Sequence, residues 1–179
     1  MIRILLVLII LGLVAIGVVF NREIIEFSQA YQANQQARDL IREKQYDRAV
    51  GIYQQAHADH PDNAAIALGL ARLYRYQKRY DEAEEIYKAL LKQEPDHLNG
   101  AMAYANMLRH VGLAENPKRL PEAIKPLQQV FEAHSDNPRL LSALGSVYKS
   151  AAESPAETRN PIRNWLYKWA IYYYRLSIG

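Results

Sequence analysis

Two histidine side chains three residues apart form the pattern in this sequence that is most like a metal site. His57 and His60 stand near the end of an expected helix, where this spacing can place two imidazoles on one face. No third ligand follows in register, although Asp59 and Asp62 are close by. Histidines that interact with the carbonyl end of a helix explain the pair more simply. We therefore predict no metal site.

The second pattern that could support chemistry is a set of carboxylates, Glu82, Glu84 and Glu85, which could act as a general acid and base. Their spacing predicts an outward helix face, where solvated charges are the simpler interpretation because no cleft surrounds them. The sequence has no glycine-rich phosphate loop, His-Glu metalloprotease motif or serine elbow. It predicts no catalytic residue, no cofactor and no enzyme.

The composition is that of a helical globular chain. The 179 residues carry a net charge of +3, 50% of them are hydrophobic, and none is cysteine. The lack of cysteine excludes disulfides, thiolate metal sites and a cysteine nucleophile. Lysine and arginine alternate with aspartate and glutamate instead of forming a basic block, so we expect no nucleic-acid partner.

A long apolar segment stands at the N-terminus. Every residue from Ile4 to Phe20 is apolar or glycine, and Arg3 can reach the lipid headgroups beside it. Such a run favours membrane insertion by about 4–8 kcal/mol. A cleaved signal peptide is the alternative, but the small-residue site at 28–30 lies too far from the apolar core. We expect residues 1–29 to form a transmembrane anchor and juxtamembrane helix, with Leu5, Leu8, Leu11, Val14 and Val18 in the bilayer.

A small difference in positive charge decides the expected orientation. Arg3 lies on one side of the apolar segment, and Arg22 lies on the other beside Glu23 and Glu26. The next cation after Arg22 is Arg38, so the short basic tail favours a cytoplasmic N-terminus. We expect a single-pass membrane protein whose remaining residues lie on the external, periplasmic side.

The helices expected to position these polar side chains belong to a sequence repeat with a period of 34 residues, so that position 45 corresponds to position 79. Residues 45–49 recur as residues 79–83, and Tyr53 recurs as Tyr87. In each unit a small, an aromatic and a small or apolar residue follow at i, i+4 and i+7, which marks one helix face. A first helix with the same periodicity precedes each, so the unit is a helical hairpin.

Small residues at the expected helix crossings, each beside a bulky neighbour, make the chain after about Ala30 similar to the tetratricopeptide repeat family. The resemblance implies an all-α solenoid of about four hairpins, at 30–63, 64–97, 98–137 and 138–179. In the third hairpin, a longer turn around residues 116–119 precedes a second helix with packing positions at Ala123, Leu127, Val130 and Ser135. In the fourth, a linker at 151–160 lengthens the turn.

The resemblance also implies a concave groove, lined by the first helix of each hairpin. We expect it to contain Asn34, Arg38, Arg42, Arg72, Arg75, Asn106, Arg109 and His110, with Tyr76, Arg139 and Lys149 beside them. None of these is a carboxylate. Arginine offers a planar bidentate donor set, so we expect acidic segments of partner proteins to bind there. A solvated basic face is the alternative. The carboxylate clamp of chaperone-binding members is not retained, because Gly69 and Ala103 occupy two of its five positions.

Three aromatic residues near the C-terminus replace the charges that earlier hairpins carry at the same positions. Trp165, Trp169 and Tyr172 follow at i, i+4 and i+7 and should form one stripe on the outer face of the last helix. We expect this stripe to dock on another protein or on the membrane surface. The alternatives are that the linker at 151–160 covers it, or that a further helix follows in a longer chain.

These features together predict a non-catalytic scaffold for protein–protein interaction. We expect an accessory or assembly subunit of a multiprotein membrane complex, whose partners are other membrane or envelope proteins and, through the anchor, the lipid bilayer. An envelope maturation factor or chaperone that captures client peptides in the groove is the alternative.

Overall fold

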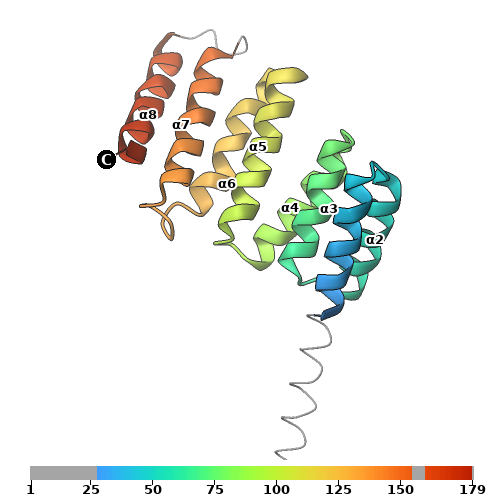
Figure 1. Cartoon of the computed structure of the whole chain (residues 1–179). Helices are drawn as coiled ribbons and strands as arrows, with labels where there is room; N and C mark the ends of the chain where they lie inside the picture. The colour runs from blue at the N-terminus through green and yellow to red at the C-terminus, as the bar shows by residue number, and fades with distance from the viewer. Residues whose placement is uncertain (1–27, 155–159, 179) are drawn as a thin grey trace, which may run out of the picture. The chain divides into compact units, whose positions relative to one another are not determined.

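The computed structural model describes residues 28–154 and 160–178, and every regular element in these ranges is a helix (Figure 1). The helical residues 28–42 are followed by α2 (Tyr46–Asp59), α3 (Ala64–Tyr76), α4 (Tyr80–Gln93), α5 (Leu98–Ala114), the 3-10 helix η1 (Pro117–Ala123), α6 (Ile124–Gln129), α7 (Pro138–Glu153) and α8 (Asn160–Ile178). The predicted all-α fold is confirmed.

The predicted transmembrane anchor falls mainly on residues 1–27, which lie outside the described residues. Leu5, Leu8, Leu11, Val14 and Val18 are all in this segment. Within residues 28–154 and 160–178, no helix combines the length and the apolar character that a membrane span needs.

The chain divides into two compact units, Met1–Leu70 and Ala71–Gly179. In the first unit, Ala37 and Ala49 are fully buried, and Tyr53 packs on Gly69. In the second unit, α5 packs against α4, α6 and α7, and α7 packs most extensively against α8. The small residues predicted at helix crossings, among them Ala83, are fully buried there. Helices that alternate direction and contact their neighbours in chain order give the second unit its layered form.

The helices before Lys44 and Lys78 end in the same type of turn, at positions 34 residues apart. Lys44 and Lys78 have φ angles of 60° and 62°, in the left-handed region. The amide of Lys78 donates to Arg75 O, and the next amide, of Arg79, donates to Tyr74 O. This pattern closes a helix by satisfying its last carbonyl groups, and it usually employs glycine. Both lysines therefore adopt a strained backbone conformation.

The third hairpin differs from the sequence prediction in its second half. The extra residues form η1, which contains Pro121. Asn116 caps the start of η1, because its side chain accepts a hydrogen bond from the amide of Lys118. The α-helix that follows is short and ends at Gln129, so Ser135 lies exposed in a turn instead of on a helix. Pro121 supplies no amide hydrogen, so it interrupts the series of helical hydrogen bonds in this segment. The predicted packing positions Ala123, Leu127 and Val130 are fully buried.

Candidate functional site

Two adjoining hollows on the second unit form the candidate site, which we name the basic groove. The first, of about 230 Å³, is lined by Arg72, Arg75, Asn99, Met102, Ala103, Asn106 and Arg139. The second, of about 210 Å³, is lined by Met102, Ala105, Asn106, Arg109, Leu127, Arg139, Ser142, Ala143, Ser146 and Val147. They share Met102, Asn106 and Arg139, so they form one continuous depression across α3, α5 and α7.

Helix periodicity places these side chains on one side of the second unit. Asn99, Met102 and Asn106 recur at i, i+3 and i+7 along α5, which puts them on a single face. The opposite face of α5 supplies the core residues Leu108 and Val111. In α3, Arg72 is exposed beside the fully buried Ala71. The packing of small and apolar residues thus turns the polar residues toward the groove.

The groove carries positive charge without acidic neutralisation. No lining residue is Asp or Glu, and within the described residues no carboxylate forms an ion pair with Arg72, Arg75 or Arg139. The guanidinium of Arg109 donates a 3.3 Å hydrogen bond to Oδ1 of Asn106. Guanidinium groups bind carboxylates with two parallel hydrogen bonds, and asparagine amides both donate to and accept from a peptide backbone. This combination suits an extended acidic peptide segment.

The structure brings Arg72, Arg75, Asn106 and Arg109 of the predicted groove set together, with Arg139 beside them. His110 does not line either hollow; it is exposed, with its ring 6.4 Å from that of Tyr80. Sequence reasoning did not assign Met102 to the site. The i, i+7 spacing of Asn99 and Asn106 could have revealed Met102, because it marks the face of α5 that also contains this residue.

Three predicted groove residues belong to the first unit, and two of them have side-chain partners there. Asn34 accepts a 2.7 Å hydrogen bond from the hydroxyl of Tyr53, so it contributes to packing. Arg42 forms a 2.9 Å ion pair with Asp39. Arg38 is exposed. The expectation of an uninterrupted basic row therefore does not hold at Arg42, where a carboxylate one helical turn away neutralises the charge.

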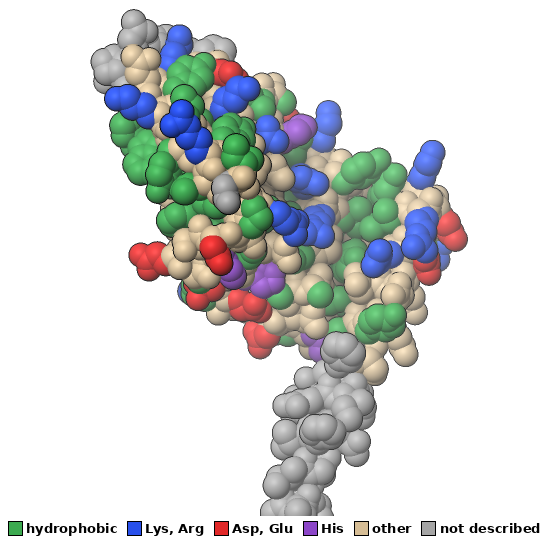
Figure 2. All heavy atoms as spheres, turned by 60° about the vertical axis from the view of Figure 1, so that its left-hand side comes forward, with side chains coloured by type: hydrophobic (Ala, Val, Ile, Leu, Met, Phe, Trp, Pro, Cys, Tyr) green, Lys and Arg blue, Asp and Glu red, His purple; other side chains and the backbone are tan. Residues whose placement is uncertain are grey.

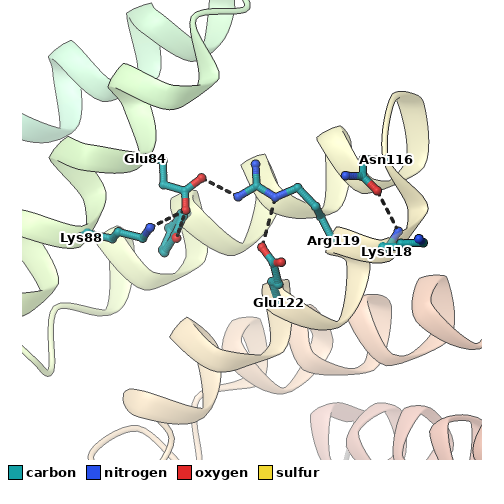
Figure 3. A network of polar contacts seen from close by, with 7 residues as sticks. Glu84, Lys88, Asn116, Lys118, Arg119 and Glu122 are labelled. Carbon is teal, nitrogen blue, oxygen red and sulfur yellow. Dashed lines mark hydrogen bonds and ion pairs between the residues drawn. The ribbon is translucent and has the colours of Figure 1, made fainter.

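A partly buried network of ion pairs and hydrogen bonds connects α4 with η1 (Figure 3). Glu84 accepts hydrogen bonds from Lys88 at 2.7 Å and from the Tyr104 hydroxyl at 2.9 Å, and it also pairs with Arg119. Arg119 in turn donates to Glu122 at 3.1 Å. The prediction that Glu84 is an ordinary solvated carboxylate is wrong, because residues from three elements surround it.

Desolvation alone would raise the pKa of Glu84, but hydrogen bonds from Lys88, Arg119 and Tyr104 lower it to about 2. With this low pKa, Glu84 is a weak base and holds no proton to donate at neutral pH, so it is a poor general acid or base. The network also forms part of the wall of a hollow of about 500 Å³ that includes Leu91, Tyr104 and Pro126. The network links the irregular η1 segment to α4 through the side chains of Glu84 and Arg119.

The aromatic stripe of α8 is only partly an outer surface. Trp165 and Tyr172 are 51% and 49% exposed. Trp169 is half-buried, because its ring stacks on the rings of Tyr148 of α7 and of Tyr173. The distances between ring centroids are 6.2 Å and 5.6 Å. The sequence prediction of a wholly outward stripe is therefore wrong at Trp169, which packs in the aromatic core of the last hairpin.

The histidine pair found in the sequence has no ligand set around it. Across the described residues, no group of three or more His, Cys, Asp or Glu side chains could hold a metal ion. The amide of His60 donates to Ala56 O, which caps the end of α2.

Known proteins share this fold. A family model described as Tetratricopeptide repeat matches residues 40–107, and one described as Tetratricopeptide Repeats-Sensor matches residues 79–178, more than half of the chain. The solved structure titled "MamA MSR-1 C2" has 17% sequence identity and a TM-score of 0.58, over 82% of this chain and 73% of its own. "Crystal structure of MamA protein" has 13% identity and a TM-score of 0.53, over 84% and 90%. At these identities the likeness concerns the fold alone. No curated protein sequence matches the chain.

Proposed function

The chain belongs to the tetratricopeptide repeat family, and from this premise we propose that it is a membrane-anchored scaffold whose basic groove binds acidic segments of partner proteins. Tetratricopeptide repeat proteins are interaction scaffolds that bind other proteins and are generally not enzymes.

The observation that carries the proposal is the charge of the basic groove. Arg72, Arg75 and Arg139 come from α3 and α7, and together with Asn99 and Asn106 of α5 they surround one hollow without a carboxylate. Clustering like charges costs free energy unless an anionic partner offsets it. An acidic peptide supplies that offset and fits an elongated depression across successive helices.

Fluorescence anisotropy with a labelled Asp- and Glu-rich peptide tests this directly. The full chain in detergent should bind this peptide and should not bind the same peptide with Asn and Gln in place of the acids. Replacing Arg72 and Arg139 with Gln should weaken binding about tenfold or more, and added salt should weaken it further. Lys149, which the sequence predicted beside the groove, lines neither hollow, so Lys149→Gln should leave binding unchanged. Equal losses in both variants would reject the groove as the site.

The membrane anchor is part of the proposal because residues 4–20 form an uninterrupted apolar run. The chain should stay in the membrane pellet after washing with alkaline carbonate, which strips proteins that are held by surface charge. Recovery in the wash would reject the anchor. For the side of the membrane, the chain's lack of cysteine is useful. Ser135→Cys, in an exposed turn, should react in whole cells with a maleimide that cannot cross membranes if the helical units are periplasmic.

We propose a stable subunit of a membrane complex in preference to a client-capture factor. After detergent extraction, a subunit should copurify with defined membrane proteins in fixed stoichiometry. A maturation factor or chaperone that captures peptides should instead be recovered mostly alone. Quantitative mass spectrometry of the purified chain separates these two outcomes.

A further inference from the structure

The outward side of α8 exposes an unusual amount of apolar surface. Most of the exposed large apolar side chains among the described residues belong to this helix, including Trp165, Ile171, Tyr172 and Leu176, which are between 43% and 53% exposed. Trp165, Tyr172 and Leu176 follow at i, i+7 and i+11, so they share one side of the helix. Exposed apolar patches that extend along a whole element usually mark an interaction surface.

Positive charge lies directly beside this apolar strip. Lys168 and Arg175 are exposed and two helical turns apart, so they form a second row along the outward side of α8. The sequence from Asn160 to Ile178 contains no Asp or Glu, so no acidic residue of the helix itself offsets them. Figure 2 shows the result in the upper left, where hydrophobic, lysine and arginine side chains mix over α7 and α8.

We propose that the outward side of α8 binds the surface of an anionic lipid bilayer. Tryptophan and tyrosine favour the headgroup region, aliphatic side chains reach the acyl boundary, and lysine and arginine pair with anionic headgroups. α8 presents all three classes side by side, and it keeps them in place because Trp169 and Tyr173 fix its inner side against Tyr148. The inference rests on the proposed membrane location, to which it adds a second contact.

A second copy of the chain fits this surface less well. Two α8 helices packed face to face would bring Lys168 and Arg175 near the same residues of the other copy, and like charges repel in a desolvated contact. An anionic surface instead attracts both cations and accepts the aromatic strip in the same orientation. The bilayer therefore satisfies the charge and the apolar area of α8 together.

The chain offers a specific reporter for this contact, since its two tryptophans, Trp165 and Trp169, are both in α8. In the full chain, Trp169→Phe leaves the exposed Trp165 as the single emitter and keeps an aromatic ring in the core. This variant is reconstituted into vesicles of phosphatidylcholine alone or mixed with phosphatidylglycerol, both containing lipids with brominated acyl chains. Bromine quenches tryptophan only at close range, so quenching measures docking of α8, whereas flotation with the vesicles measures the anchor.

In vesicles with phosphatidylglycerol, Trp165 emission should shift to shorter wavelength and be quenched, and high salt should reduce both effects. Adding Lys168→Gln and Arg175→Gln should lower the equilibrium constant for docking of α8 on the vesicle surface on the order of ten- to thirtyfold. Lys149→Gln on α7 removes one exposed positive charge outside α8 and, as a control, should have no effect.

Each other outcome decides between the two membrane contacts. Flotation with both vesicle types but an unquenched Trp165 overturns the α8 contact and leaves the anchor. Flotation only with phosphatidylglycerol, together with quenching of Trp165, supports the α8 contact and rejects the anchor, and no flotation with either vesicle type rejects both. A shift in Trp165 emission that depends on protein concentration and not on lipid identifies a second copy as the partner and overturns the proposal.

Discussion

The hydroxyl of Tyr53 donates a 2.7 Å hydrogen bond to Oδ1 of Asn34, nineteen residues earlier in the chain. Tyr87 occupies the same position one repeat later and is fully buried, but its hydroxyl has no hydrogen-bond partner among the described residues. The residue that corresponds to Asn34 is Leu68, which has no side-chain acceptor. Two equivalent tyrosines thus differ in one hydrogen bond.

This difference predicts opposite effects of the same substitution. Tyr53→Phe should lower the free energy of unfolding by about 1 kcal/mol, because it removes a part-buried hydrogen bond and leaves Asn34 without this donor. Tyr87→Phe should leave stability unchanged or raise it, because it removes an unsatisfied hydroxyl. Chemical unfolding followed by circular dichroism measures both. Equal losses would show that both hydroxyls are satisfied in solution.

The left-handed lysines predict a gain in stability. Lys44→Gly and Lys78→Gly should each stabilise the chain by about 0.5–1 kcal/mol, because glycine adopts a positive φ without steric cost. Lys149→Gly, within α7, is the control and should destabilise by about 1 kcal/mol. Thermal unfolding compares the three variants. A loss of stability in Lys78→Gly would mean that the lysine side chain matters more than the backbone strain.

Two glycines in the first unit should respond in opposite ways to replacement by alanine. A Cβ atom at Gly69 would lie 2.5 Å from the ring of Tyr53, so Gly69→Ala should destabilise by about 1–3 kcal/mol. At Gly51, within α2, no atom lies within 4 Å of the added methyl group, so Gly51→Ala should stabilise by about 1 kcal/mol. The unfolding midpoint should therefore move in opposite directions. A shift in the same direction would contradict the packing of Tyr53 on Gly69.

The ion network around Glu84 predicts a dependence of stability on pH. The pKa of Glu84 is lowered to about 2 from its ordinary 4.5, so its contribution is present above about pH 4.5 and lost as pH falls toward 2. At neutral pH, Glu84→Gln should destabilise the chain by about 1–3 kcal/mol. Between pH 4.5 and 2 the wild type should lose more stability than this variant. Parallel pH profiles for the two proteins would rule out an ionised Glu84 as the stabilising group.

The sequence predicted the regular hairpins because their packing depends on local spacing. The 34-residue period placed Ala83 and Tyr87 in the core, and the same period brought Arg72, Arg75 and Arg109 to one side of the second unit. These features follow from helix periodicity and from repetition, both of which are visible without coordinates.

The features that the sequence did not predict depend on contacts between distant or irregular segments. Glu84 meets Arg119 across 35 residues, and Arg119 stands in the inserted turn, which has no counterpart in the other hairpins. Trp169 stacks on Tyr148 of α7, so this position of α8 packs inward, although earlier hairpins carry charged residues there. Periodicity alone does not reveal how an insertion folds or how a diverged helix turns.

If the charge of the basic groove selects its partner, inverting that charge should invert the preference. We predict that the full chain with Arg72→Glu and Arg139→Glu loses binding of a labelled acidic peptide and gains binding of a Lys-rich peptide of equal length. Fluorescence anisotropy at low salt measures both affinities, and circular dichroism verifies that the helices are retained. A folded variant that still prefers the acidic peptide would show that the charge of the basic groove does not select the partner.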